Sequence, residues 1–142
     1  MRMIFVNLPV QDLEASKRFF GALGFQFNPQ FSDDNAACMI VDENIFVMLL
    51  ARDYFRTFIT GDISDPARGV EVLTALSADS RAEVDDILAK ALAAGGKPWK
   101  PILDMGPMYG CSFQDLDGHV WEVMYMDQAA LAEAPQAAAE SA

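Results

Sequence analysis

The sequence predicts an α+β fold in which a β-α-β-β-β module occurs twice in tandem. Strand-like and helix-like segments follow the same order in both halves of the chain, and the residues that end these segments match between the halves. By position, Val10 corresponds to Ala78 and Cys38 to Cys111. The chain has 142 residues, which is enough for one domain with a sizeable hydrophobic core.

The first module begins with an apolar run at residues 3–8, which predicts a strand that Pro9 closes. Asp12 can cap a helix whose apolar side chains recur at helical spacing until Gly24 ends it. Three further strands are expected at residues 25–27, 36–41 and 45–50, because turn-forming residues separate these apolar segments.

The second module repeats this order. A strand is expected at residues 71–78, followed by a helix that Asp79 caps and that Gly95 and Gly96 end. The segment 97–103 predicts an irregular or edge strand, because it contains Pro98 and Pro101. Two regular strands follow at residues 108–114 and 120–126.

These elements predict a single duplicated domain over residues 1–126, with module one at 1–50, a linker at 51–69 and module two at 70–126. The linker can form a short helix at residues 53–59, and its aromatic side chains either pack over the junction or form a flap over a binding cleft. An alanine-rich tail covers residues 127–142, with a helical turn or two expected at 128–134 and frayed chain beyond.

The charge balance is acidic, with 21 acidic against 10 basic residues and a net charge of −11. It argues against a nucleic acid or an anionic membrane as partner, and it is compatible with a cationic small molecule. We expect a cytoplasmic protein, since no apolar run has the length of a membrane span or the flanks of a signal peptide. Cys38 and Cys111 are expected to be reduced, buried thiols.

Three segments give the chain a family resemblance. Residues 115–123, Asp-Leu-Asp-Gly-His-Val-Trp-Glu-Val, together with the repeated module order, resemble the vicinal oxygen chelate superfamily of glyoxalase I, extradiol dioxygenases and bleomycin resistance proteins. The strand-helix unit at residues 10–25 looks like the same family's opening, and residues 28–33 are similar to its glyoxalase-related branch of predicted lactoylglutathione lyases. The resemblance covers about residues 3–126.

The resemblance implies a curved mixed sheet around a cleft, with metal ligands on the first and last strand of each module. Carried onto this sequence, these positions are Phe5, Met48, Leu73 and Glu122, of which three are apolar. One carboxylate cannot hold a divalent ion in competition with water, so we predict no metal and no cofactor. The single histidine, His119, is expected to be an exposed turn residue on the face opposite Glu122.

Glu122 is the candidate catalytic residue, because an isolated carboxylate on an apolar strand suits a general base. The alternatives, which we favour over catalysis, are that it anchors a ligand or is a relic of a metal site, satisfied by Asn7, Arg2 or water. The candidate ligand-binding residues expected to line the cleft with it are Phe5, Asn7, Met48, Leu50, Leu73, Ala75, Tyr109 and Met124.

The first functional hypothesis is a metal-free homodimer that binds a small, aromatic or cationic molecule in an apolar, methionine-rich cleft. The alternative is a glyoxalase-like lyase or isomerase that uses Glu122 as general base, so the sequence leaves open whether the protein is an enzyme. A third hypothesis is an interaction domain whose own side chains close the cleft.

Overall fold

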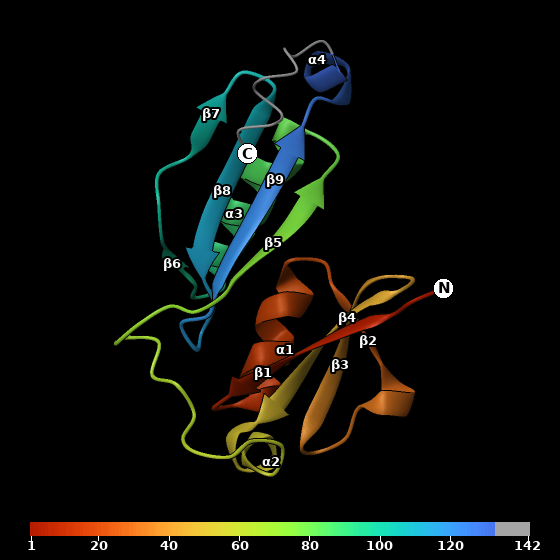
Figure 1. Ribbon diagram of the computed structural model, residues 1–142, viewed down its shortest axis with the longest axis vertical. Coiled ribbons are helices and arrows are strands. Elements are labelled where there is room, and N and C mark those ends of the chain that lie inside the picture. The colour runs from red at the N-terminus through yellow and green to blue at the C-terminus, as the bar shows by residue number, and fades with distance from the viewer. Residues whose placement is uncertain (133–142) are drawn as a thin grey trace.

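The computed structural model describes residues 1–132 and contains two mixed sheets, one in each half of the chain (Figure 1). In the first sheet the strand order is β1-β4-β3-β2, with β1 parallel to β4 and the other pairs antiparallel. The elements of this half are β1 (Ile4–Val10), α1 (Leu13–Ala22), β2 (Gln26–Asn28), the 3-10 helix η1 (Pro29–Phe31), β3 (Ala36–Asp42) and β4 (Ile45–Ala51).

The second sheet repeats this order as β5-β9-β8-β6, with β5 parallel to β9, and β7 also pairs with β8. The remaining elements are α2 (Arg52–Arg56), β5 (Leu73–Ala78), α3 (Arg81–Ala93), β6 (Lys97–Pro98), β7 (Leu103–Met105), β8 (Met108–Gln114), β9 (Val120–Met126) and α4 (Gln128–Ala132). The tandem α+β architecture is therefore confirmed. The frayed tail expected after α4 lies outside the described residues.

Three local expectations are wrong. Pro9 does not close the first strand, because β1 is an edge strand that tolerates a residue without an N–H. The segment 97–103 is not one strand: it splits into β6 and the start of β7, with Pro98 and Pro101 unable to donate ladder hydrogen bonds. Ser80, rather than Asp79, caps α3, since its hydroxyl accepts the Glu83 N–H at 3.0 Å.

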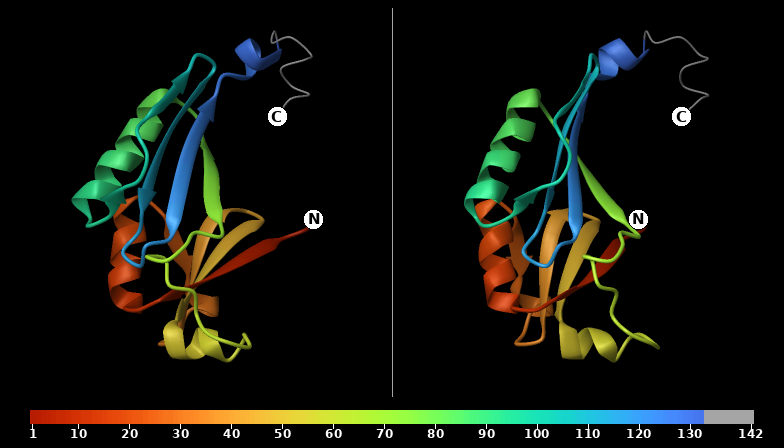
Figure 2. Two further views of the ribbon diagram at one scale, coloured as in Figure 1. Left: turned by 60° about the vertical axis from the view of Figure 1, so that its left-hand side comes forward. Right: turned by 90° about the vertical axis from the view of Figure 1, so that its left-hand side faces the viewer.

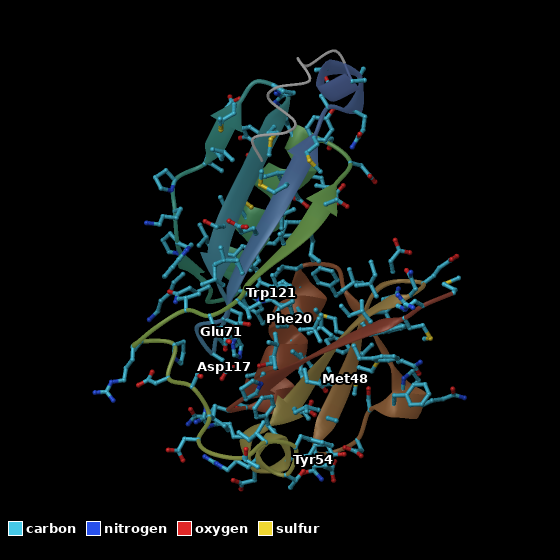
Figure 3. The ribbon with its side chains drawn as sticks, in the orientation of Figure 1. Phe20, Met48, Tyr54, Glu71, Asp117 and Trp121 are labelled. Atoms are coloured by element: carbon cyan, nitrogen blue, oxygen red, sulfur yellow. The ribbon has the colours of Figure 1, made fainter. Side chains whose placement is uncertain are left out.

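Both long helices lie on one side of the molecule and both sheets on the other (Figure 2). On the helix side, α1 packs against strands of both modules. The ring of Phe20 lies 5.1 Å from that of Trp121 on β9, and the ring of Phe19 lies 6.3 Å from that of Phe113 on β8. These buried aromatic residues join the two modules into one hydrophobic core, and Figure 3 shows Phe20 and Trp121 together where the modules meet.

The turn between β8 and β9, residues 115–119, forms a polar link between the modules. The Asp117 carboxylate accepts the Gln11 N–H at 2.8 Å and the Ser16 hydroxyl at 3.3 Å. His119 Nε2 hydrogen-bonds the Pro9 carbonyl at 2.8 Å, so this half-buried histidine is not the exposed turn residue that the sequence predicts. The contact joins residues that are 110 positions apart, which local sequence patterns do not reveal.

Asp115 is the buried centre of this turn. Its carboxylate accepts hydrogen bonds from the Trp121 indole at 3.0 Å and from the N–H groups of Asp117 and His119. Burial raises the pKa of this carboxyl above its usual value, and nearby His119 and these hydrogen bonds oppose the rise.

A pH dependence follows from the raised pKa of Asp115. The Asp115 carboxyl binds its proton more tightly in the folded state than in the unfolded state. Its contribution to stability is therefore fully present below the pKa that it has in the unfolded chain, and it is lost as pH rises through the pKa that it has in the folded protein. We expect the unfolding free energy of the wild type, relative to Asp115→Asn, to fall as pH rises from acidic to neutral. Urea titrations of both proteins across that pH range measure this difference in unfolding free energy. A difference that rises with pH instead would show that the hydrogen bonds and His119 outweigh the effect of burial on the pKa of Asp115.

Both cysteines are buried free thiols, as predicted. Burial raises the pKa of Cys38, and it raises the pKa of Cys111 to about 11, so both stay in the weakly nucleophilic thiol form at neutral pH. Among residues 1–132, no helix has the length and apolar character needed to cross a membrane.

Candidate functional site

The outward face of the first sheet, away from the helices, carries a hollow of about 430 Å³, which we call the aromatic hollow. It is lined by Met3, Phe5, Asn7, Asn28, Phe31, Cys38, Phe46 and Met48. None of these side chains is charged, and the polar groups among them are two amides and a thiol. Such a lining suits a small, mostly apolar ligand that is oriented by a few hydrogen bonds.

Strand alternation builds this hollow. Residues two apart share a sheet face, so β1 contributes Phe5 and Asn7, and β4 contributes Phe46 and Met48. Asn7 lies directly opposite Met48 in the parallel register. Phe31 reaches the rim from η1, which begins at Pro29 after the Asn28 side chain accepts the Gln30 N–H at 2.9 Å.

The aromatic hollow offers an exposed aromatic surface. The rings of Phe5 and Phe46 are stacked, with centroids 5.0 Å apart and planes 13° apart. Phe5 remains 46% exposed and Phe31 is 62% exposed, although both are large apolar side chains. Exposed aromatic rings around a concave, uncharged surface are typical of a binding site for a planar molecule.

The linker extends this surface. Tyr54 on α2 and Phe58 just after it line an adjoining hollow together with Met48, Leu50 and Phe31. Their rings meet edge to face at 5.0 Å, and Figure 3 shows Tyr54 on α2 below the sheet that carries Met48. The aromatic residues of the linker therefore lie beside the candidate site. The surplus of aromatic residues in a connecting segment was the sequence signal for this.

The sequence prediction did not include Phe31, Phe46, Tyr54 or Phe58 among the site residues. Phe46 could have been found from its alternation with Met48 and Leu50 on one strand. Phe31 follows a proline-initiated turn, and nothing in the local sequence indicates that this turn folds back over the sheet.

The second sheet carries the other predicted residues on its own outward face. Glu122 is half-buried on β9, opposite Ala75 of β5 and Ser112 of β8 in the strand registers. Met124 lies two residues further along β9, with its sulfur over Gly110, where a Cβ would overlap it. None of these residues lines the aromatic hollow. The chain therefore brings Phe5, Asn7, Met48 and Leu50 together on one sheet and Leu73, Ala75, Glu122 and Met124 on the other.

Tyr109 does not join either group. It lies opposite Tyr125 and thus on the helix side of the second sheet, where its hydroxyl donates to Asp85 of α3 at 2.7 Å. That hydrogen bond raises the pKa of Tyr109.

Comparison with known proteins shows which proteins the chain resembles in sequence and in fold. Residues 2–42 match the family model described as bleomycin resistance protein-like N-terminal. A glyoxalase/bleomycin resistance protein/dioxygenase family enzyme from Burkholderia phytofirmans shares the fold over 89% of this chain and 99% of its own, with a TM-score of 0.74 and 18% identity. The chain therefore has the fold of this solved structure, and its N-terminal part is similar to bleomycin resistance proteins.

Two other solved structures share the fold of the chain. A hypothetical protein from S. aureus is 28% identical over 88% of this chain and 94% of its own, with a TM-score of 0.76. The fosfomycin resistance protein FosX from Listeria monocytogenes is 17% identical and covers 88% of this chain and 93% of its own, with a TM-score of 0.64. No curated protein matches the chain.

The four positions at which the family resemblance implies metal ligands do not suit a divalent ion. They are Phe5 and Met48 on one sheet and Leu73 and Glu122 on the other, so one carboxylate is the only hard donor in this set. Within residues 1–132, no three His, Cys, Asp or Glu side chains are grouped so that they could hold a metal ion. Zinc, iron and manganese need several such donors at one point, so these four residues do not form a divalent-metal site.

Proposed function

We propose that the chain binds a small, planar and mostly apolar molecule in the aromatic hollow, and that it does so without a divalent metal. The observation that carries this proposal is the stacked pair of Phe5 and Phe46 beside exposed Phe31, in a hollow without charged lining residues. The ligand would stack on the Phe5 ring, fill the space beside Met48 and meet the amide of Asn7 at the rim.

We further propose that the protein is a homodimer. Among the described strands, β1 and β5 are each paired on one side only, and apolar side chains at these free edges, Ile4 and Leu73, are exposed. A paired arrangement of β1 in one copy with β5 in the other would cover both edges. It would also place the second sheet of one copy beside the aromatic hollow of the other, and Glu122, on the second strand from that edge, would then attract a positively charged group on the ligand.

Replacing Phe5 with alanine tests the binding site. The variant loses the stacking surface and about 1.5–3 kcal/mol of apolar burial, so we expect the dissociation constant of an aromatic ligand to rise by about 10-fold to 100-fold. The ligand is first chosen by thermal shift from planar neutral and cationic compounds, and calorimetric titration then compares the variants. Phe5 is half exposed, so the fold should survive.

Two control variants sharpen this test. Phe5→Leu keeps apolar volume without the ring and should lose part of the affinity, whereas Leu92→Ala on α3 changes an exposed apolar residue away from the site and should lose none. Equal affinity in Phe5→Ala and the wild type would contradict the proposal.

A glyoxalase-like lyase is the second candidate, because Glu122 is half-buried and stands at a position where the family resemblance implies a metal-binding, acid–base glutamate. Without a Lewis acid, the enediolate intermediate loses stabilisation on the order of several kcal/mol, so we rank this activity second. Turnover of the methylglyoxal–glutathione adduct by the wild type and by Glu122→Gln tests it. An inactive wild type excludes this candidate, and activity that Glu122→Gln abolishes supports it.

A further inference from the structure

Three methionines form a straight row across the second sheet, far along the chain from the aromatic hollow. Met105 of β7 lies opposite Met108 of β8, and Met108 lies opposite Met126 of β9. Residues directly opposite in antiparallel strands share a face, with Cβ atoms about 4.5–5.5 Å apart. The three side chains, which we call the methionine row, therefore stand side by side on the outward face.

The turn that carries two of these methionines is held in place. Gly106 adopts a positive φ of 71°, and the Arg81 guanidinium of α3 donates to its carbonyl. The same guanidinium lies 5.6 Å from the ring centres of both Tyr109 and Tyr125. Arg81 of α3 thus restrains the short hairpin between β7 and β8, a kind of turn that is usually mobile.

The next turn adds a further restraint on the row. The Asp127 N–H donates to the Pro107 carbonyl at 2.7 Å, which ties the residue after Met126 to the residue before Met108. This bond and the pairing of β7 with β8 hold the backbone at the three methionines in place, which lowers the ordering that binding of one ligand would require.

The two end residues of the methionine row are exposed, and within residues 1–132 the carboxylates next to them in the sequence lie on the other face or accept a hydrogen bond. Met105 is 64% exposed and Met126 is 38% exposed. Of the nearby carboxylates, Asp104 lies opposite Tyr109 and so shares its helix-side face, and Asp127 accepts the Ala130 N–H at 3.2 Å. The face that the row presents is therefore rich in thioether sulfur, with Met124 next along β9.

We propose that the methionine row is a binding site for a soft monovalent cation, Cu(I), held by the sulfurs of Met105, Met108 and Met126. Thioether sulfur is a soft ligand that selects Cu(I) over hard divalent ions, and three neutral donors suit a cation of single charge. This site is separate from the superfamily's divalent-metal positions and does not depend on the proposed ligand binding. If the row served packing alone, leucine would serve equally well.

Leucine variants distinguish Cu(I) binding from a role in packing alone, because leucine keeps the apolar volume of methionine and removes its sulfur. In anaerobic buffer with a chromogenic Cu(I) chelator as competitor, we expect the wild type to take up one equivalent of Cu(I). The variant Met105→Leu, at an exposed turn position, should bind at least ~10-fold more weakly, and the triple variant with Met108→Leu and Met126→Leu should bind none. Met39→Leu in the buried core of the other module is the matched control, and because leucine keeps the volume of the side chain it should bind Cu(I) like the wild type.

Methyl spectra of methionine-labelled protein locate the ion. Adding one equivalent of Ag(I), a redox-stable substitute, should shift the methyl signals of the row and leave that of buried Met39 unchanged. A wild type that takes up no Cu(I), or a triple variant that still binds one equivalent at its cysteine thiols, would overturn the proposal.

Discussion

Replacing Trp121 with alanine is expected to lower the free energy of unfolding by about 3–5 kcal/mol. The indole is buried at the contact between the modules, with its ring 5.1 Å from that of Phe20. Its Nε1 also donates to the buried Asp115 carboxylate at 3.0 Å, so the variant leaves both a cavity and a carboxylate with one donor fewer. Urea unfolding followed by circular dichroism measures the loss.

The other tryptophan provides the control for this prediction. Trp99 lies between β6 and β7 and is exposed, so Trp99→Ala should change the unfolding free energy by no more than about 0.5 kcal/mol. Equal losses in the two variants would mean that the contact between Phe20 and Trp121 does not join the modules into one core.

Replacing Leu73 with aspartate is expected to convert the proposed homodimer into monomers. Leu73 is 52% exposed on β5, an edge strand, and a carboxylate buried there without a partner costs several kcal/mol, which corresponds to at least ~100-fold weaker association. Light scattering after size-exclusion chromatography gives the mass of each protein. Leu92→Asp, at an exposed position on α3, is the control and should leave the mass unchanged.

Two outcomes would contradict the dimer proposal. A wild type with the mass of one chain at working concentration shows no dimer, and a Leu73→Asp variant that keeps the mass of two chains shows that the interface lies elsewhere. The binding measurement with Phe5→Ala remains informative in both cases, because the aromatic hollow is built from one chain.

The residues that share one strand were predictable from the sequence, because period-two alternation decides which side chains face together. Phe5 with Asn7 and Met48 with Leu50 follow directly from that rule. Tyr109 shows the limit of the alternation rule. Which face its side chain occupies depends on the register of β8 against β9, and the sequence of one strand does not contain that register.

The relation between the two modules could not be predicted either. The sequence predicts that Phe5 and Glu122 face one cleft between the modules. In the structure Phe5 lies on β1 and Glu122 on β9, and contacts between distant residues, such as Phe20 with Trp121 and His119 with Pro9, join the two modules. These contacts come from side chains whose local patterns indicate only buried or turn positions, so their partners become visible only in three dimensions.

The methyl spectrum of the methionines, recorded during titration with the aromatic compound that gives the largest thermal shift, tests the proposed binding site most directly. Met48 lines the aromatic hollow and Met39 lies in the buried core of the same module. If the ligand stacks on Phe5, its ring current should shift the Met48 methyl signal in a saturable manner and leave Met39 in place. A saturable titration in which the Met124 signal moves and the Met48 signal does not would place the ligand on the sheet of Glu122 and contradict the aromatic hollow as the binding site.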